Sequence, residues 1–558
     1  MPNLKSHILA TTCLAFAGGA LFASDAFAAS SPDIYGGGSS LVAPYIRQAG
    51  DCYGLPTQLI TKGSPPTFTT ITPFNYVNPP HSQDCSTTHY KTDRTVHFIS
   101  TGSGTGILAI FSHDPTLYGH VDAGNSTFYP EVHYGMSDAG LSSTDVANYN
   151  NGGTETQGAA SVVLVAPGVT PGAGQYGNPK QLYGPLVQFP ISIDPVAIAY
   201  DPVYKKVFSG DVNNPTTYKF NIHAPRADGS GGLHLDATTY CKIFNGQITN
   251  WNDPALKKLN GNQSLEDPSD PTPAGSWSVP LQIVGRSDSS GTSSIFTRHL
   301  ANVCASVGGN QYADGSTTLP STLFGANYDK TQVNNAPAGE TLGKFTEAAG
   351  SDGIAKYVAF TTNPSSGTLV QGRLGYLGPD FALPAVLNTN QNSYGLNTAS
   401  LKNASGQFEA PTSATAQKAF AVLAPPQSDA SGHYDSSQPG DRSAPDQWVQ
   451  PVFKTSPLAN PTTSGAYPMV GTTNFLGYTC YKTPVQFSTV NNFFVWYTGG
   501  IVTNGANGLL SKAGLAAVSP AWRTAIKETF TNDSQGLGLN FAKVGTAGAC
   551  SVAGVKGG

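Results

Sequence analysis

The sequence predicts an α/β fold in which β-strands alternate with helices around largely parallel sheets. Short β-rich apolar segments are followed by turns rich in Gly and Ser and then by amphipathic stretches, which is the order expected of βα units. The 558 residues include 63 Gly and 41 Pro but only 11% charged residues, which argues against a coiled coil, a long-helix bundle or a polyelectrolyte tail. The length predicts two or more lobes and is ample for a hydrophobic core.

The elements are expected in the following order along the chain. Strands are predicted at residues 96–99, 161–165, 195–200, 281–284 and 374–377, and helices at 41–49, 107–111, 295–303 and 488–497. Long polar stretches lie between them, at residues 56–92, 148–179, 260–275 and 428–446. None of these stretches carries enough apolar residues for a core of its own, so we expect surface insertions and not separate domains. The sequence contains no internal repeat.

The first 29 residues have the pattern of an export signal. Lys5 provides a positive start, residues 8–22 are apolar and small, and Ala26-Phe27-Ala28 has the small-x-small form that signal peptidase cleaves. About 15 apolar residues are too few for a transmembrane helix, which needs ~20. Cys13 lies inside the apolar run, so no lipid anchor is expected. We therefore expect cleavage near Ala28 and a mature protein that is periplasmic or secreted.

The charge balance excludes some partners. A net charge of −5 provides no basic field for nucleic acid or anionic lipid. An uncharged, polar and turn-rich composition is typical of an exported globular protein, and we expect a monomer.

The cysteines predict disulfides. Removal of the signal removes Cys13 and leaves an even set, namely Cys52, Cys85, Cys241, Cys304, Cys480 and Cys550. Six cysteines in an exported chain predict three disulfides, and fifteen connectivities are open from sequence alone. Sequential pairing (52–85, 241–304 and 480–550) closes the shortest loops and is the pairing that we expect. The alternative is a metal site, but the sequence has no CxxC motif and no His pair at ligand spacing, so no metal or other cofactor is expected.

Four segments share one design, in which a strand leads into a Gly/Ser/Thr turn that opens a helix. They are residues 36–41, 100–106, 135–138 and 285–292. Such turns leave the first backbone N–H groups of a helix unpaired at the positive end of its dipole, where they can bind an oxyanion. Taken singly, each of the first three is more often a simple N-cap. The second segment lacks the Lys-Ser/Thr of a P-loop, so nucleotide binding is not expected.

The fourth segment, GRSDSSGT, is the most specific. Arg286 is a permanent cation whose planar fork matches a tetrahedral oxyanion. Ser290, Gly291 and Thr292 supply hydroxyls and amides at the start of the helix, and Asp288 can hold the guanidinium in place. The alternative is a surface Arg–Asp pair beside an ordinary N-cap.

Eight motifs occur in the order of one known family between about residues 33 and 550. They are DIYGGG, TGSGTG, HYGMSDAGLS, IDPVAIAY, CKIFNGQITNWND, GRSDSSGTSSIFTRHLANVC, GRLGYLGPDF and YPMVGTTNFLGYTCY. The first resembles the DINGGG opening of the DING proteins, which are relatives of the phosphate-binding proteins of bacterial ABC transporters. Two positions depart from the family pattern, because Tyr35 replaces Asn and Ser40 stands where Thr is common. Ser40 keeps the hydroxyl, so we expect binding to survive.

The resemblance implies a two-lobed periplasmic-binding-protein fold of the Venus-flytrap type, with mixed, mostly parallel sheets flanked by helices and two hinge crossings. Residues 29–190 with 466–558 would form the first lobe and residues 191–465 the second. The lobes of that family close on one dehydrated phosphate. Carried over residue by residue, the implied contacts come from the backbone of Ser40 and Leu41 and from Ser103, Asp138, Arg286, Ser290, Gly291 and Thr292. Asp288 matches the residue that orients the arginine. The family also pairs cysteines equivalent to 241–304 and 480–550, whereas 52–85 would bridge an insertion particular to this chain.

Asp138 predicts how such a site selects its ligand. A carboxylate repels an anion unless the ligand carries a proton that the carboxylate can accept. Phosphate in its mono- and dibasic forms does, and sulfate at neutral pH does not, a mismatch on the order of 10⁴–10⁵ in selectivity. Arsenate has the proton pattern of phosphate and should be excluded poorly. A net binding free energy of about −8 kcal/mol would correspond to a micromolar dissociation constant. The alternative role for Asp138 is a helix N-cap beside Ser142.

Three functions remain in competition. The leading one is a non-enzymatic phosphate binder that delivers phosphate to an ABC permease. The second is a secreted phosphatase, because weak phosphatase activity is associated with some DING relatives. Against it, the sequence shows no His/Asp metal cluster and no GxSxG elbow, and no general base is identifiable beside Ser103. The third is a surface or matrix protein that keeps the fold and uses its insertions for other contacts.

Overall fold

The structure is a computed structural model that describes most of the chain. The described residues are 32–55, 90–118, 129–206, 216–224, 231–304, 307, 345–359, 372–382, 395–427, 440–452, 457–499, 508–546 and 548–558. The predicted signal peptide and Cys85 lie outside the described residues, and so do most of the predicted insertions at 56–92 and 428–446.

The first main sheet has five strands in the order β2-β1-β3-β17-β7. Its strands are β1 (Ile34–Gly38), β2 (Val96–Ser100), β3 (Tyr134–Ser137), β7 (Leu186–Pro195) and β17 (Val470–Tyr478). β1 pairs parallel with β2 and β3, whereas β17 runs antiparallel to both β3 and β7. Every residue of β7 and β17 is buried, as expected of strands covered on both faces.

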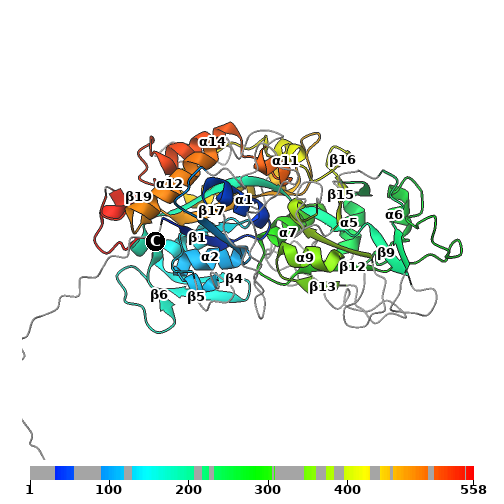
Figure 1. Ribbon diagram of the computed structural model, residues 1–558, viewed down its shortest axis with the longest axis horizontal. Helices are drawn as coiled ribbons and strands as arrows, with labels where there is room; N and C mark the ends of the chain where they lie inside the picture. The colour runs from blue at the N-terminus through cyan, green and yellow to red at the C-terminus, as the bar shows by residue number, and fades with distance from the viewer. Residues whose placement is uncertain are drawn as a thin grey trace, which may run out of the picture.

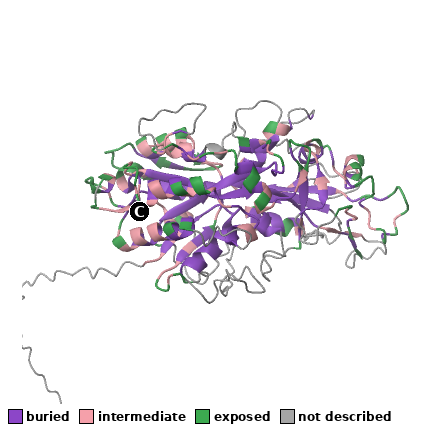
Figure 2. Ribbon diagram, turned by 90° about the horizontal axis from the view of Figure 1, so that it is seen from above, coloured by how far each residue is buried: buried purple, intermediate pink, exposed green. Residues whose placement is uncertain are grey.

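Helices cover both faces of this sheet. α1 (Ala43–Tyr53) packs on β2 and α12 (Pro484–Gly499) on β1, while α2 (Ser103–Ser112) packs on β1 and β3. Figure 1 shows α2 below the strands and α12 above them, with α14 (Pro520–Ile526) beyond α12. The buried strands therefore lie in the middle of a three-layer lobe, as the burial colours of Figure 2 show.

The second main sheet has seven strands in the order β11-β15-β8-β14-β12-β13, with β16 paired to β15. The strands are β8 (Ala197–Tyr200), β11 (Leu233–Leu235), β12 (Leu281–Arg286), β13 (Phe345–Ala348), β14 (Gly372–Leu377), β15 (Asn397–Lys402) and β16 (Phe408–Glu409). β12 pairs parallel with β13 and β14, and β8 runs antiparallel to β14 and β15.

Alternate residues of this sheet face two different helices. Phe296 of α7 (Gly291–Val303) stacks on Tyr376 of β14, with 4.2 Å between ring centroids. On the other face, Val284 and Leu377 belong to an apolar cluster with Ile354 of α9 (Gly350–Ala359). Successive side chains of a strand point to opposite faces, so α7 and α9 lie on opposite sides of the sheet.

The chain passes directly from one main sheet to the other. β7 ends at Pro195 and β8 begins at Ala197, so only Val196 lies between them. β8 runs antiparallel to β14 and β15 in the second sheet, and β17 runs antiparallel to β3 and β7 in the first, so both sheets are mixed. The α/β two-lobed fold class with mixed sheets is confirmed.

The predicted lobe boundaries stay a prediction. One stretch inside the predicted second lobe packs against elements of the first sheet. α11 (Ser413–Phe420) contacts β7, and Trp448 of the 3-10 segment η5 (Pro445–Val452) lies 6.2 Å from Trp522 of α14, measured between ring centroids.

Smaller elements complete the fold. The predicted insertion at 148–179 contains a three-stranded sheet of β4 (Gly153–Gln157), β5 (Ala160–Leu164) and β6 (Gln175–Tyr176), which packs on α2. The remaining helices are α3 (Ser143–Asn151), α4 (Pro179–Tyr183), α5 (Ala237–Phe244), α6 (Pro254–Leu259) and α13 (Leu509–Lys512). The remaining strands are β9 (Val203–Lys206), β10 (Thr216–Lys219), β18 (Cys480–Tyr481) and β19 (Ala542–Lys543). Short 3-10 or π segments are η1 (Pro115–Leu117), η4 (Pro379–Phe381), η6 (Pro457–Ala459), η8 (Lys527–Thr531) and η9 (Gly548–Ser551).

Among the described residues, no helix combines the length and the apolar character needed to cross a membrane.

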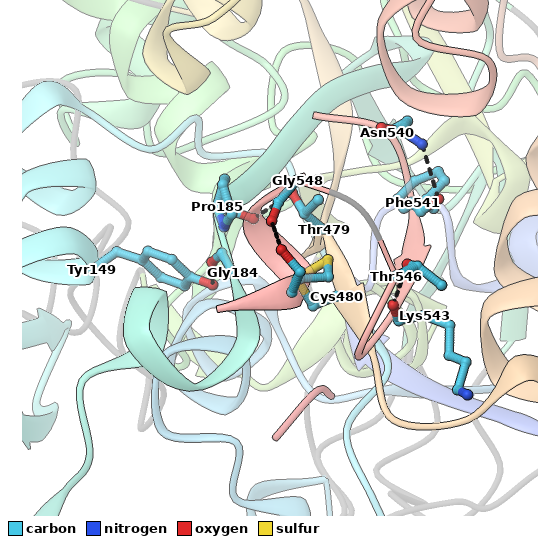
Figure 3. Close-up of a disulfide and its surroundings, with 12 residues drawn as sticks. Tyr149, Gly184, Pro185, Thr479, Cys480, Asn540, Phe541, Lys543, Thr546 and Gly548 are labelled. Atoms are coloured by element: carbon cyan, nitrogen blue, oxygen red, sulfur yellow. Dashed lines mark hydrogen bonds between the residues drawn. A yellow bond between two sulfur atoms is a disulfide. The ribbon is translucent and has the colours of Figure 1, made fainter. Parts of the chain in front are cut away.

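Two of the three expected disulfides are present in the described part of the chain. Cys241 of α5 is bonded to Cys304 at the end of α7, and Cys480 of β18 to Cys550. Figure 3 shows the second bond beside Thr479, whose hydroxyl donates to the carbonyl of Pro185 at 2.9 Å. The expected 52–85 pair depends on Cys85, which is outside the described residues.

Candidate functional site

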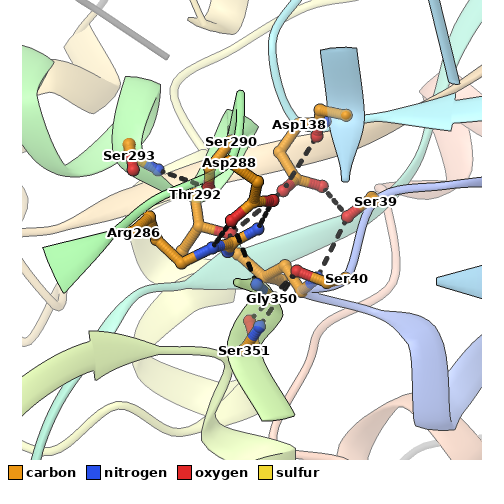
Figure 4. A network of polar contacts seen from close by, with 12 residues as sticks. Ser39, Ser40, Asp138, Arg286, Asp288, Ser290, Thr292, Ser293, Gly350 and Ser351 are labelled. Atoms are coloured by element: carbon orange, nitrogen blue, oxygen red, sulfur yellow. Dashed lines mark hydrogen bonds and ion pairs between the residues drawn. The ribbon is translucent and has the colours of Figure 1, made fainter. Parts of the chain in front are cut away.

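Corners from both sheets meet at one place in the fold. Figure 4 shows the ends of β1 and β3 from the first sheet facing the end of β12 and the starts of α7 and α9 from the second. Each corner is a strand that leads into a turn and then a helix, so the amide groups at the helix starts face the same region. The corners after β1, β3 and β12, together with the one between β2 and α2 that contains Ser103, are the four segments singled out in the sequence.

Arg286 is the cation of the site and is held by Asp288. Its Nε donates to Asp288 Oδ1 at 2.7 Å, and a second nitrogen, Nη2, donates to Oδ2. The amide of Gly350, at the start of α9, also donates to Asp288 Oδ1 at 3.0 Å. Burial alone would lower the pKa of Arg286, but the carboxylate of Asp288 outweighs it and the pKa is raised. Arg286 therefore stays charged although its side chain is only 1% exposed.

The start of α7 lies between Arg286 and Asp138. Ser290 is the N-cap, and its Oγ accepts from the amide of Ser293 at 3.1 Å, which leaves the Ser290 hydroxyl hydrogen available for another acceptor. Arg286 Nη1 donates to Thr292 Oγ1 at 3.3 Å, and Thr292 Oγ1 in turn donates to Asp138 Oδ2 at 3.3 Å. This hydroxyl joins the two sheets.

Gly291 is required by the close approach of the two sheets. A Cβ atom at this position would lie 2.5 Å from Ser103 Oγ and 2.7 Å from Asp138 Cβ. Both distances are well inside van der Waals contact, so a larger residue would hold the second sheet away from α2 and β3.

Asp138 is a buried carboxyl surrounded by hydroxyl groups. Ser39 Oγ and Thr473 Oγ1 donate to Oδ1, the latter at 2.7 Å, and Ser103 Oγ lies 3.5 Å from Oδ2. The backbone amide of Asp138 donates to Ser103 Oγ at 3.2 Å. Burial raises the pKa of Asp138, while these hydroxyl groups and Arg286 act in the opposite direction. The alternative role as an N-cap is not seen, because Ser142 caps α3.

The first corner contributes Ser40 and Leu41. Ser40 Oγ accepts from the amide of Ser351 in α9 at 3.1 Å, which ties β1 to the second sheet. The amide of Leu41 donates to Ser39 Oγ at 3.2 Å. The structure thus brings all of the predicted contact residues to one region, and their role as ligand contacts stays a prediction.

Five groups near the site were not predicted. The Gly350–Ser351 corner follows the same strand–Gly/Ser–helix pattern as the other four, so the sequence contained a signal for it. Ser39 lies in the first of the four segments and Thr473 in a motif quoted for the resemblance, but nothing marks them off from neighbouring hydroxyl residues. Asp194 and Asp380 are buried carboxyls that reach the site only through the pairing of strands far apart in the chain.

This arrangement suits a tetrahedral oxyanion that carries a hydrogen. One guanidinium, several hydroxyls and the amides at helix starts can donate, while the Asp138 carboxylate is an acceptor among them. In the described part of the chain, no group of three or more His, Cys, Asp or Glu side chains is placed to hold a metal ion.

Comparison with known proteins gives relatives over most of the chain. It is 28% identical over 448 residues to alkaline phosphatase L of Pseudomonas aeruginosa, covering 80% of this chain and 85% of that protein. It is 25% identical over 454 residues to a phosphate-binding protein of an unknown prokaryotic organism, covering 80% and 91%. A shorter match of 89 residues, 38% identical, links it to phosphate-binding protein PstS 3 of Mycobacterium leprae and covers 16% of this chain and 20% of that protein.

Solved structures share the fold. A high affinity periplasmic phosphate-binding protein (PfluDING) bound with phosphate superposes with a TM-score of 0.53 at 22% identity, covering 91% of this chain and 96% of that one. A DING protein superposes with a TM-score of 0.55 at 21% identity, covering 93% and 99%. The resemblance indicated by the eight motifs is therefore confirmed. A family model described as the PBP superfamily domain matches residues 84–499, so the chain belongs to the PBP superfamily.

Proposed function

We propose that this protein binds inorganic phosphate between its two lobes and excludes sulfate. The single observation that carries the proposal is the meeting of Arg286 and Asp138, a fixed cation and a hydroxyl-bound carboxyl, through Thr292. A cation with many donors attracts an anion, and a lone acceptor among them requires that the anion carry a hydrogen. Phosphate meets both requirements. The names of the relatives, which include phosphate-binding proteins, support the same ligand.

The predicted contact set belongs to this proposal. Ser290 would donate its hydroxyl hydrogen, and Ser103 and Thr292 would turn theirs from Asp138 to the ligand. Ser40, Leu41 and Gly291 would present the backbone, and Asp288 would hold the guanidinium of Arg286. A buried anion loses its hydration, so several charge-assisted hydrogen bonds, each worth roughly 1.5–3 kcal/mol, are needed to replace it.

Calorimetric titration with phosphate tests the proposal. The wild type should bind one phosphate, and Arg286→Ala should weaken binding by roughly 10²–10⁴-fold, because at least two charge-assisted hydrogen bonds are lost. Arg442→Ala is the matched control, since Arg442 also pairs with a carboxylate (Nη1 to Glu528 at 2.8 Å) but takes no part in the site. Unchanged affinity in Arg286→Ala, in a variant whose circular dichroism matches the wild type, would refute the assigned site.

The transport role is the finer part of the proposal. The protein would act outside the cytoplasm, after cleavage near Ala28 and without a lipid anchor, as a monomer that delivers phosphate to an ABC permease. Relatives named for phosphate binding support this role. Light scattering coupled to size exclusion tests the monomer, and mass spectrometry of protein from the producing cell tests the cleavage.

A secreted phosphatase is the second candidate, because relatives at 25–28% identity carry the name alkaline phosphatase L. Turnover of a chromogenic phosphate ester by purified protein would favour it. If turnover is seen and is abolished by a chelator, the protein is an enzyme and not only a binder. Phosphate binding without turnover favours the transport role.

A further inference from the structure

A second buried carboxyl lies behind Asp138 in the first sheet. Asp194 stands in β7 and Thr473 in the neighbouring strand β17. Thr473 Oγ1 lies 2.7 Å from Asp138 Oδ1 and 2.7 Å from Asp194 Oδ2. One threonine hydroxyl therefore bridges two carboxyl groups, and all three side chains belong to fully buried residues.

The bridge requires a proton on one of the two carboxyls. A threonine hydroxyl has a single hydrogen, so it can donate to one carboxyl only. At its other short contact it must accept, and only a protonated carboxyl can donate there. With both carboxyls ionised, one contact would place two oxygen lone pairs 2.7 Å apart in a buried site.

The distribution of donors decides which carboxyl is ionised. Asp138 accepts from Ser39, from Thr292 and from Ser103, and Thr292 is itself hydrogen-bonded to the Arg286 guanidinium. Donors of this kind stabilise a carboxylate. Asp194 has a weaker set, because only Thr473 and Ser192 act on its carboxyl as hydrogen-bond donors and neither is hydrogen-bonded to a guanidinium, as Thr292 is. The proton therefore resides on Asp194, which donates to Thr473, and Thr473 donates to Asp138.

The charges around Asp194 favour the same assignment. Burial, and after it the negative charge of Asp138, raises the pKa of Asp194 to about 7, against the opposing hydroxyls of Thr473 and Ser192. The titratable groups that face it from other elements are Asp138 after β3, Asp380 of η4 and Tyr497 of α12. Burial raises the pKa of both Asp380 and Tyr497, and neither side chain can carry a positive charge.

We propose that Asp194 is a positioning residue that holds the proton of this carboxyl pair and, through Thr473, keeps Asp138 ionised as the acceptor for the hydrogen of bound phosphate. The inference rests on the proposed phosphate-binding function. When Asp194 loses its proton at higher pH, a second negative charge stands behind Asp138, and phosphate binding weakens. By linkage, bound phosphate raises the proton affinity of Asp194 by the same factor.

Asp194→Asn separates this role from a purely structural one. An Asn amide donates to Thr473 as the protonated Asp does, but it cannot ionise. The affinity of the variant for inorganic phosphate, divided by that of the wild type at the same pH, cancels the ionisation of the ligand itself. We expect this ratio to be about 1 near pH 5.5 and to rise to about tenfold or more near pH 8.5. Asp194→Ser, which is also neutral, should show the same rise and serves if the Asn variant does not fold.

Asp380→Asn is the matched control. Asp380 is another buried carboxyl of the same cluster, but neither of its oxygens makes a hydrogen bond within the described residues and no hydroxyl joins it to Asp138. The phosphate affinity of Asp380→Asn, divided by that of the wild type at the same pH, should not change between about pH 5.5 and about pH 8.5. A flat ratio for both Asp194 variants, or an equal rise for Asp380→Asn, would overturn the inference.

A double-mutant cycle tests the hydroxyl bridge. In a Thr473→Val background the bridge is absent, so Asp194→Asn should change phosphate affinity less than it does in the wild type near pH 8.5. An equal change would mean that Asp194 acts without Thr473 and would overturn the positioning role. A wild type that binds no phosphate at any pH would refute the proposed function itself, whereas a wild type that binds with flat ratios refutes only the role of Asp194.

Discussion

Two carboxyl groups near the site, Asp288 beside the second sheet and Asp194 within the first, are in opposite states. The guanidinium of Arg286 lowers the pKa of Asp288 although burial acts to raise it. Burial raises the pKa of Asp194 to about 7, the charge of Asp138 adds to the shift, and the hydrogen bonds of Thr473 and Ser192 oppose it. The difference follows the nearest charged partner, a cation for Asp288 and a second carboxyl for Asp194, together with the deeper burial of Asp194. The second sheet thus contributes a fixed ion pair, and the first sheet a carboxyl pair that shares a proton.

The largest effect on ligand affinity is expected from Asp138→Asn, which replaces the carboxylate acceptor of the site with an amide. The amide can donate to an anion that has no hydrogen, so sulfate affinity should rise, by up to about 10⁴-fold. Competition between sulfate and phosphate, followed by calorimetry, measures the change. Arsenate affinity should stay close to that of phosphate in the wild type. Equal sulfate affinity in the variant and the wild type would remove the proposed basis of selectivity.

An intermediate effect is expected on the free energy of unfolding as a function of pH. Its sign is opposite for Asp288 and for Asp194. The pKa of Asp288 is lowered from 3.8, so its ion pair stabilises the fold above that value and the stabilisation is lost as the pH falls through the lower folded pKa. The pKa of Asp194 is raised from 3.8 to about 7, so its contribution is lost as the pH rises between these values.

Urea unfolding of Asp288→Asn and Asp194→Asn between about pH 3 and pH 8 measures both contributions, each expected to be about 1–3 kcal/mol. Asp288→Asn should be less stable than the wild type at neutral pH and approach it in acid. The free energy of unfolding of Asp194→Asn should increase relative to that of the wild type as the pH rises from about 4 to about 7. Parallel curves for the wild type and both variants would show that the two carboxyls are not in different states.

The smallest effects concern the contact between β1 and α9. Ser40→Ala removes the oxygen that accepts from the Ser351 amide and leaves this buried donor unpaired, which costs about 1 kcal/mol, or roughly fivefold in phosphate affinity. Ser351→Ala removes only a contact of 3.4 Å between the two hydroxyls, so a change below about twofold is expected. Reversal of this order, measured by titration, would mean that the Ser351 hydroxyl and not its amide connects the lobes.

Patterns in the sequence predicted the strand–turn–helix corners of the site. They did not predict the buried carboxyl and hydroxyl groups behind those corners. A strand followed by Gly and Ser and then a helix is a local pattern, so Arg286, Ser290 and the other expected contacts could be predicted, and Gly350–Ser351 carried the same pattern unnoticed. Asp194 and Thr473 lie about 280 positions apart, and only the antiparallel pairing of β7 with β17 brings them together. No local spacing encodes that pairing. The mixed, mostly parallel sheets implied by the resemblance are confirmed, but which strands run antiparallel, β17 in the first sheet and β8 in the second, was not predicted.

The disulfide between Cys241 and Cys304 has a consequence for how the protein must be made. It ties the far end of α7 to α5, while the near end of the same helix presents Ser290 and Thr292 to the site. In a reducing cytoplasm that end of the helix would be held only by packing and by the hydrogen bonds of Arg298 and His299, and the direction in which its first turn points would be less firmly set. Protein produced under reducing conditions can be folded and still bind less well than the disulfide-bonded form, so binding should be measured on oxidised protein.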